Sequence, residues 1–217
     1  TVGADADAIS LHESFASEID LLCGQARLSR DLRCGEPVLT DEFILELFSA
    51  RHPVLQAMIG SDNVPNDIVI GKNHKCILIT GANTGGKTVL LKTAGLCTLM
   101  ALHGMHIPAS PDSRVGSFST IMTDIGDDQS IEKSLSTFSG QIVALNDMAE
   151  KSERGALVLL DEIMAGTNPR YGAALAQSYL ETLVSSGALI IATTHYPELR
   201  NLPATDARFV NASVSFD

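Results

Sequence analysis

The sequence predicts an α/β fold built on a mainly parallel β-sheet with helices on both of its faces. Three observations favour this class. Short, continuous apolar runs, the form taken by strands buried on both faces, alternate with longer stretches of helical periodicity. At 217 residues, 45% of them hydrophobic, the chain is long enough to bury a full core. Glycine-rich, acidic or histidine-containing segments follow the apolar runs, as expected where parallel strands end at one edge of a sheet.

The periodicity along the chain predicts each element in turn. Residues 9–34 carry apolar positions at helical spacing, and Gly35-Glu36-Pro37 ends this stretch, so we expect one long helix or two shorter ones. A short helix is expected over 41–50, before a break at Arg51-His52-Pro53. Further strands are expected over 67–70, 76–80, 119–123, 156–160, 188–193 and, at an edge, 209–216, with helices over 89–103, 139–151 and 171–185.

A glycine-rich segment, Gly81-Ala82-Asn83-Thr84-Gly85-Gly86-Lys87-Thr88, follows the predicted strand 76–80 and matches the pattern of a phosphate loop. In such a loop the backbone N–H groups and the next helix's N-terminus face a phosphate. Lys87, on a loop that we expect to be exposed, can reach the β- and γ-phosphates, and the Thr88 hydroxyl can ligate Mg²⁺. The alternative is an ordinary glycine turn, but strand, loop, lysine, hydroxyl and helix occur in the required order. The sequence therefore predicts that the chain binds a nucleoside triphosphate.

Candidate catalytic residues follow two further apolar strands. Asp161 and Glu162 come directly after the run 156–160, and a buried parallel strand would bring them beside the phosphate loop. We expect Asp161 to hold Mg²⁺ and Glu162 to polarise the attacking water. His195 follows the last apolar run of the sheet, where it can donate a hydrogen bond to the γ-phosphate. In isolation, each of these residues could equally be an ordinary side chain at a strand end.

Ser134-Leu135-Ser136-Thr137-Phe138-Ser139 precedes the predicted helix 139–151 and has the hydroxyl-rich composition of a helix N-terminus. By itself this pattern indicates only a capping residue. Together with a phosphate loop it suggests a second anion-binding surface. In ABC-like ATPases a surface of this kind completes the nucleotide site of the opposite subunit, so Ser136 is a candidate contact in trans.

Taken together, these motifs resemble the ATPase domain of the MutS family of DNA mismatch-repair and recombination proteins, in particular its second bacterial branch, linked to suppressing recombination. The resemblance covers nearly the whole chain. Asn83-Thr84-Gly85-Gly86-Lys87-Thr88 is specific to this branch, and Ser136-Thr137-Phe138 is typical of the family. Other shared segments are Ala50-Arg51-His52-Pro53-Val54-Leu55, Val64-Pro65-Asn66-Asp67-Ile68, Asp124-Ile125-Gly126-Asp127-Asp128-Gln129-Ser130-Ile131, Gly166-Thr167-Asn168-Pro169 and Thr194-His195-Tyr196.

The resemblance implies a P-loop NTPase fold of the ABC-like kind, with a mixed or parallel sheet covered by helices and an N-terminal helical appendage. Residues 1–36 would be the helical end of the core or lever region, and 37–217 the ATPase domain. It implies ATP and Mg²⁺ as cofactors, phosphate contacts along Gly81–Val89, and catalysis by Lys87, Glu162 and His195. Val64 and Asn66 would lie at the adenine ring. The domains would pair head to tail as a homodimer, and DNA, mismatched or branched, would bind through domains absent from this chain.

Composition limits the other functions that the chain can have. The formal net charge is −11 and no basic run is present, so we do not expect this chain alone to hold nucleic acid tightly. No apolar run approaches the ~20 residues that span a bilayer, so we expect no membrane partner. The four cysteines form no C-x-x-C pair and indicate a reduced, cytoplasmic protein. The first residue is not methionine, which suggests a fragment of a longer protein.

Two other functions fit part of the pattern. An ABC transporter's nucleotide-binding subunit should carry Leu-Ser-Gly-Gly-Gln, which Leu135 to Gln141 matches only loosely, and should separate its two nucleotide motifs more widely. A nucleotide-gated scaffold would bind ATP without turning it over. Intact Glu162 and His195 speak against the scaffold, and hydrolysis measured in a single turnover would distinguish it from an ATPase.

Overall fold

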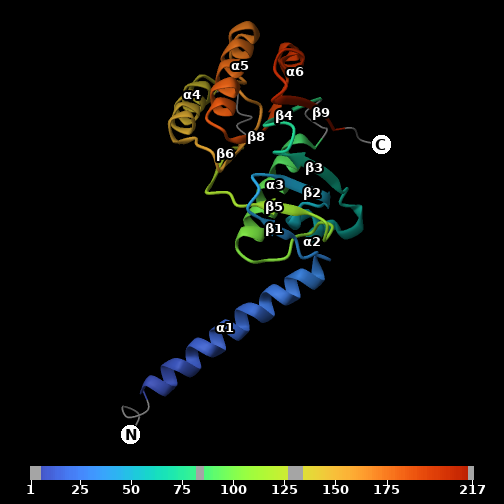
Figure 1. Cartoon of the computed structure of the whole chain (residues 1–217), viewed down its shortest axis with the longest axis vertical. Coiled ribbons are helices and arrows are strands. Elements are labelled where there is room, and N and C mark those ends of the chain that lie inside the picture. Colours follow the sequence, from blue (N-terminus) through green and yellow to red (C-terminus); the bar gives the residue numbers. More distant parts are fainter. Residues whose placement is uncertain (1–5, 82–85, 127–133, 215–217) are drawn as a thin grey trace.

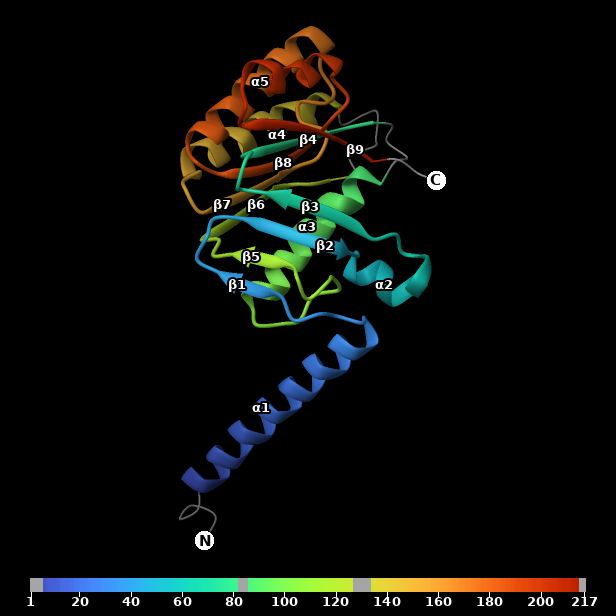
Figure 2. The same ribbon diagram turned by 45° about the vertical axis from the view of Figure 1, so that its right-hand side comes forward.

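The structure is a computed structural model that describes residues 6–81, 86–126 and 134–214. Its N-terminal part is a single long helix, α1 (Ala6–Asp31), which projects away from the rest of the chain (Figure 1). This confirms the helical segment expected over 9–34 as one unbroken helix. Large apolar side chains of α1, among them Phe15, Ile19 and Leu22, are more than half exposed. The remaining elements form two sheets with helices packed against them (Figure 2).

The main sheet has five parallel strands in the order β6-β7-β8-β4-β9. They are β4 (Cys76–Thr80), β6 (Thr120–Asp124), β7 (Ala156–Leu160), β8 (Leu189–Thr194) and β9 (Phe209–Ser213). Every residue of β4, β7 and β8 is buried, as their continuous apolar sequences predict. The strand predicted at an edge is β9, which lies at the end of the sheet next to β4.

Helices cover both faces of this sheet, and alternate residues of each strand contact different helices. On one face, α4 (Ser134–Lys151) and α5 (Pro169–Ser185) pack in a cluster that includes Cys76 and Leu78 of β4. On the other face, α3 (Lys87–Leu102) packs in a cluster that includes Ile77 and Ile79. Gly95 of α3 lies so near β7 that a Cβ there would be 2.8 Å from the Leu159 side chain. The predicted α/β arrangement is therefore confirmed.

A second, four-stranded sheet lies against the face covered by α3 (Figure 2). Its order is β1-β5-β2-β3, with β2 antiparallel to both of its neighbours and β1 parallel to β5. The strands are β1 (Val38–Thr40), β2 (Leu45–Ala50), β3 (Asn66–Ile70) and β5 (Arg114–Gly116). This sheet makes the fold mixed rather than wholly parallel.

The helix predicted over 41–50 is wrong, because the chain forms strand β2 there. Leu45 and Leu47 pair with Ile70 and Ile68 of β3 and are completely buried. Their spacing fits a strand as well as a helix, and the tertiary pairing decides between the two. Glu46, between them, is also buried, and its carboxylate is neutralised by nearby cations: the hydrogen bond from Lys72 lowers its pKa, with a smaller effect of Arg114.

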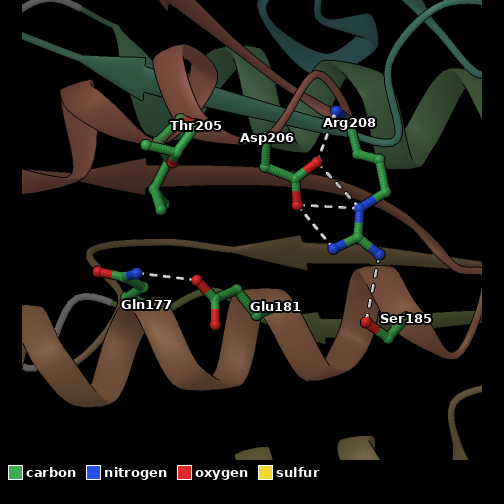
Figure 3. A network of polar contacts seen from close by, with 7 residues as sticks. Gln177, Glu181, Ser185, Thr205, Asp206 and Arg208 are labelled. Carbon is green, nitrogen blue, oxygen red and sulfur yellow. Dashed lines mark hydrogen bonds and ion pairs between the residues drawn. The ribbon is translucent and has the colours of Figure 1, made fainter.

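Short helical elements connect strands within each sheet, two between β2 and β3 and two between β8 and β9. They are α2 (Pro53–Ile59), α6 (Leu202–Thr205) and two 3₁₀ helices, η2 (Gly60–Asp62) and η5 (Pro197–Asn201). The turn that leads into β9 is tied to α5 by a polar network (Figure 3): Arg208 pairs with Asp206 at 2.6 Å and donates to the Ser185 hydroxyl at 3.2 Å. The hydrogen bond from Arg208 lowers the pKa of Asp206, so this pair stays ionised.

The close approach of Gly172 in α5 to the Tyr196 side chain allows the packing of α5 against the sheet to be tested. Tyr196 is buried, and a Cβ on Gly172 would lie 2.1 Å from its hydroxyl oxygen. We expect Gly172→Ala to reduce the free energy of unfolding by about 1–3 kcal/mol, measured by urea denaturation. The matched control is Gly24→Ala in α1, where no atom lies within 4 Å of the new methyl group and about 0.5–1 kcal/mol of stabilisation is expected. Equal effects at both glycines would contradict the packing described here.

Candidate functional site

The residues proposed from sequence motifs gather at the carboxyl edge of the main sheet. Because its five strands are parallel, their C-terminal ends lie on the same side. Gly81 follows β4, Asp161 follows β7 and His195 follows β8. The strand register pairs Thr80 with Thr194 and Asp124 with Leu160, so the segments that follow start level with one another. Residues separated by more than 100 positions in the sequence are thereby brought to one site.

The ends of the phosphate loop have the backbone geometry that its glycines allow. Gly86 has φ 77° and caps α3, whose first hydrogen bond runs from Leu90 N–H to the Gly86 carbonyl at 2.9 Å. Lys87 is the first residue of α3, and its Nζ donates to the Gly81 carbonyl at 2.5 Å. The expectation that this lysine is exposed is wrong: it is 2% exposed, and its Nζ reaches back to the Gly81 carbonyl. Ala82, Asn83, Thr84 and Gly85 lie outside the described residues.

Asp161 is the centre of a network of hydroxyl groups. Its Oδ2 accepts a hydrogen bond from the Thr88 hydroxyl, and its Oδ1 accepts one from the Thr193 hydroxyl, each at 2.6 Å. Thr88 lies in the first turn of α3 and Thr193 near the end of β8, so one carboxylate joins three elements. The predicted pair of magnesium ligands, Thr88 and Asp161, is therefore in direct contact.

The two acids are held by the same threonine. The Thr193 hydroxyl, which donates to Asp161, also accepts a hydrogen bond from the Glu162 N–H at 2.7 Å. Glu162 has φ 48° and Met164 φ 59°, a left-handed conformation that non-glycine residues seldom adopt. The Tyr196 hydroxyl donates to the Met164 carbonyl, which holds this unfavourable turn from the next strand. The backbone of the half-buried Glu162 is thus fixed by Thr193 at its own N–H and by Tyr196 at the turn that follows.

His195 and Ser136 lie at the ends of their elements in different surroundings. His195 directly follows β8, is exposed, and its ring centroid is 4.2 Å from that of Tyr196. Ser136 falls in the first turn of α4, which begins at Ser134, and its side chain lies outside the described part of the chain. The same helix is tied to the sheet edge by Gln141, whose amide donates to the Asp124 carboxylate at 2.7 Å.

A groove of about 410 Å³ lies beside the phosphate loop. One wall is formed by residues 64–69 and another by 210–214, with Ile79 and Leu90 among the apolar residues that line it. Val64 is exposed and Asn66 half-buried, and the Asn66 amide donates to the Val64 carbonyl at 3.2 Å. A Cβ on Gly81 would lie 3.9 Å from the Val214 carbonyl, so the groove meets the loop. We call it the base groove.

Sequence motifs assigned no role to Thr193 or to the contact between Asp124 and Gln141. Thr193 is a completely buried hydroxyl at the end of an apolar strand, which is the signal that could have found it. Asn63 is 4% exposed, and its amide donates to the His52 carbonyl and the Gln56 side chain. It therefore fixes the turn before the base groove rather than facing the groove. No sequence pattern indicates this, because its partners come from α2 and its cap.

A phosphate loop between a buried parallel strand and a helix, with an acid pair at the end of a strand two places away in the same sheet, defines the protein as a P-loop NTPase. Residues 77–217 match the family model described as MutS domain V. Over its whole length the chain is 49% identical to "Endonuclease MutS2" of Symbiobacterium thermophilum, 45% to that of Bacillus cytotoxicus and 44% to that of Bacillus thuringiensis. The chain therefore belongs to the MutS family and carries its ATPase domain.

These relatives confirm the resemblance to the second bacterial branch. The chain spans 27% of the length of each of these relatives. Within the described ranges, no helix is long and apolar enough to cross a membrane.

The network around Asp161 can be tested by removing one hydroxyl. Thr193→Val keeps the shape of the side chain but removes the hydrogen bond to Asp161 Oδ1 and the acceptor of the Glu162 N–H, while Thr88 still donates to Asp161 Oδ2. Unsatisfied buried groups cost about 1–3 kcal/mol each, so we expect a loss of stability in that range and weaker metal-dependent nucleotide binding. The matched control is Thr98→Val, another completely buried threonine whose hydroxyl donates only to a helix carbonyl. If both variants behave alike in urea denaturation and nucleotide titration, Thr193 does not organise the site.

Proposed function

We propose that this chain binds ATP with Mg²⁺ and hydrolyses it to ADP and phosphate. The observation that carries the proposal is the contact of Thr88 and Thr193 with Asp161, which joins the phosphate loop to the acid pair. Membership of the MutS family supports the same function. It also disfavours the transporter subunit, since the matched family model is MutS domain V.

The phosphates would lie against the loop from Gly81 to Val89. In this assignment the N–H groups of Ala82, Asn83, Thr84, Gly85 and Gly86 face the β-phosphate, as the sequence pattern of the loop requires. Lys87 would exchange the Gly81 carbonyl for the β- and γ-phosphates, which are stronger acceptors because they are charged. The adenine ring would occupy the base groove beside Val64 and Asn66. The walls of this groove combine apolar side chains such as Ile79 and Leu90 with polar groups, which suits a flat heterocycle that has nitrogen atoms at its edge.

The residues that would hold Mg²⁺ fit that ion. Mg²⁺ prefers hard oxygen ligands, and the Thr88 hydroxyl and Asp161 carboxylate are 2.6 Å apart at the mouth of the loop. A bound Mg²⁺ would neutralise charge on the phosphate oxygens. Thr193 would keep the Asp161 carboxylate oriented through its hydrogen bond to Oδ1.

Glu162 is the proposed general base. The following turn and Thr193 hold its backbone, so its carboxylate can accept a proton from water that attacks the γ-phosphate. His195, exposed at the end of the adjacent strand, would donate a hydrogen bond to the γ-phosphate or to that water. Lys87 would stabilise the charge that develops on the transferred phosphoryl group.

The test of this function is hydrolysis in a single turnover by Glu162→Gln. Amide and carboxylate have the same shape, so ATP affinity should change little, while loss of the base should slow hydrolysis by about 10²–10⁴-fold. Glu153→Gln, an exposed glutamate on the loop before β7, is the matched control and should hydrolyse ATP at the parent rate. A wild-type chain that binds ATP without hydrolysing it would support the nucleotide-gated scaffold instead.

The proposed function also includes a place for this chain in a longer protein and partners for it. Residues 1–36 would be the end of the lever that joins the ATPase domain, 37–217, to the rest of a longer cytoplasmic protein. That protein would act on mismatched or branched DNA in repair or recombination, through domains outside this chain. The ATPase domains would form a homodimer, with Ser136 near the start of α4 facing the γ-phosphate of the opposite subunit. Gln141, bound to Asp124, would hold that helix end against the sheet.

Mixing two inactive variants tests whether Ser136 acts in trans. Ser136→Ala should lower turnover but hardly change ATP affinity, and Lys87→Ala should abolish productive ATP binding. In a mixed dimer, one composite site then combines an intact phosphate loop with an intact Ser136, so we expect activity above the sum of the separate variants. If Ser136 acts in cis, both sites of the mixed dimer stay defective and no activity returns. Turnover should be measured over a range of protein concentrations, because the site needs two chains.

A further inference from the structure

A second pocket lies between the end of α1 and the start of α2. Its volume is about 280 Å³, and it shares no lining residue with the base groove. Arg33 comes from the turn after α1, Ser49 and Arg51 from the end of β2, and Gln56 from α2. Ser61 of η2 and Ser110, on the segment before β5, complete the polar lining. The pocket thus joins the projecting helix to the body of the domain.

The side chains around this pocket are rich in hydrogen-bond donors. Two of its nine lining residues are arginines, and none of the nine is acidic. Arg51 Nε donates to the Asn63 carbonyl at 3.1 Å, and within the described part of the chain its two terminal nitrogens have no hydrogen-bond partner. Gln56 is 93% buried, and its carbonyl oxygen accepts from Asn63. Among the described residues, none accepts a hydrogen bond from the Gln56 amide nitrogen. Since no buried side-chain nitrogen or oxygen of the described residues lacks a partner, this amide nitrogen is open to solvent and can donate to a ligand in the pocket.

The backbone around the pocket is strained in the same way as the backbone of the nucleotide site. In the described ranges, four non-glycine residues have positive φ: Glu162 of the acid pair, Met164 shortly after it, and Arg33 and Ser49, which line this pocket. Arg33, at φ 54°, lies in the turn after α1, where the Cys34 N–H donates to the Ser29 carbonyl at 2.8 Å. Glycine is the residue usually found at such a helix end. An arginine there is unfavourable for the backbone, which points to a use for its side chain.

We propose that this pocket binds the phosphate group of a small molecule. Two guanidinium groups, an amide and serine hydroxyls supply several donors, which suits an anion with several acceptor oxygens. The concave shape and small volume favour a small ligand, and an extended nucleic acid would need a basic stripe that a chain of net charge −11 does not show. A phosphate held by Arg33 and Arg51 would tie α1 to α2. Through Arg51 and Asn63 the same contact reaches the turn before Val64 of the base groove.

The experiment is a calorimetric titration with inorganic pyrophosphate at constant ionic strength. The phosphate loop is silenced either by Lys87→Ala or, without a mutation, by saturating the wild-type chain with ADP. We expect saturable binding at one site in both backgrounds. Arg33→Gly should weaken this binding by about 10–100-fold, the effect of losing a hydrogen bond to a charged group. Without pyrophosphate it should also raise Tm by about 2–4 °C, because glycine relieves the left-handed backbone.

Two further variants separate charge from strain. Arg33→Gln should weaken pyrophosphate binding without raising Tm, since it removes the charge and keeps a side chain at φ 54°. Arg30→Gln, an exposed arginine one turn earlier that pairs with Asp31, should bind pyrophosphate like the parent. The proposal is overturned if neither background binds pyrophosphate, if Arg33→Gly keeps the parent affinity, or if duplex DNA binds more tightly than pyrophosphate and depends on Arg33. None of these outcomes depends on whether the chain hydrolyses ATP.

Discussion

The hydrogen bonds that the Asp161 carboxylate accepts from Thr88 and Thr193 hold the candidate nucleotide site together. Each donor comes from a different element, the first turn of α3 and the end of β8, while Asp161 itself directly follows β7. A carboxylate at the edge of a buried sheet is costly unless its oxygens are satisfied, and hydroxyl donors satisfy them without adding charge. The site can therefore take up a cation without first breaking an ion pair between the described residues.

The turn after Asp161 combines strain with support. Glu162 and Met164 have left-handed backbone conformations, each unfavourable for a residue with a Cβ. Thr193 and Tyr196, both from the β8 side, hold this turn through the Glu162 N–H and the Met164 carbonyl. Gly172 of α5 lacks the side chain that would displace Tyr196. The backbone of the acid pair is thus held by β8 and the residues after it. Tyr196 in turn packs against α5, so the candidate base is connected to that helix.

The second sheet and α2 position the residues that form one wall of the base groove. Arg51 donates to the Asn63 carbonyl, and the Asn63 amide binds the His52 carbonyl, so the turn before Val64 is fixed from α2. Pro53 begins α2 after the His52 cap, whose ring accepts the Leu55 N–H at 3.4 Å. The Arg51-His52-Pro53 segment therefore shapes one wall of the base groove from a distance. The same arginine lines the pocket at the foot of α1, which makes this region the link between the projecting helix and the nucleotide site.

The sequence by itself determined the parallel sheet, its helices and the residues that meet at its edge. Continuous apolar strands such as β7 can be buried only on both faces, and parallel strands must end on one side, so Gly81, Asp161 and His195 follow from local pattern alone. Tertiary structure decided what depends on contacts between distant segments. Residues 45–50 became a strand because Leu45 and Leu47 pair with β3, although their spacing also fits a helix. Lys87 is buried because its side chain reaches the Gly81 carbonyl, and Thr193 joins both acids because β8 lies beside β7. Such contacts depend on which strands are neighbours, and periodicity along one segment carries no information about its neighbour.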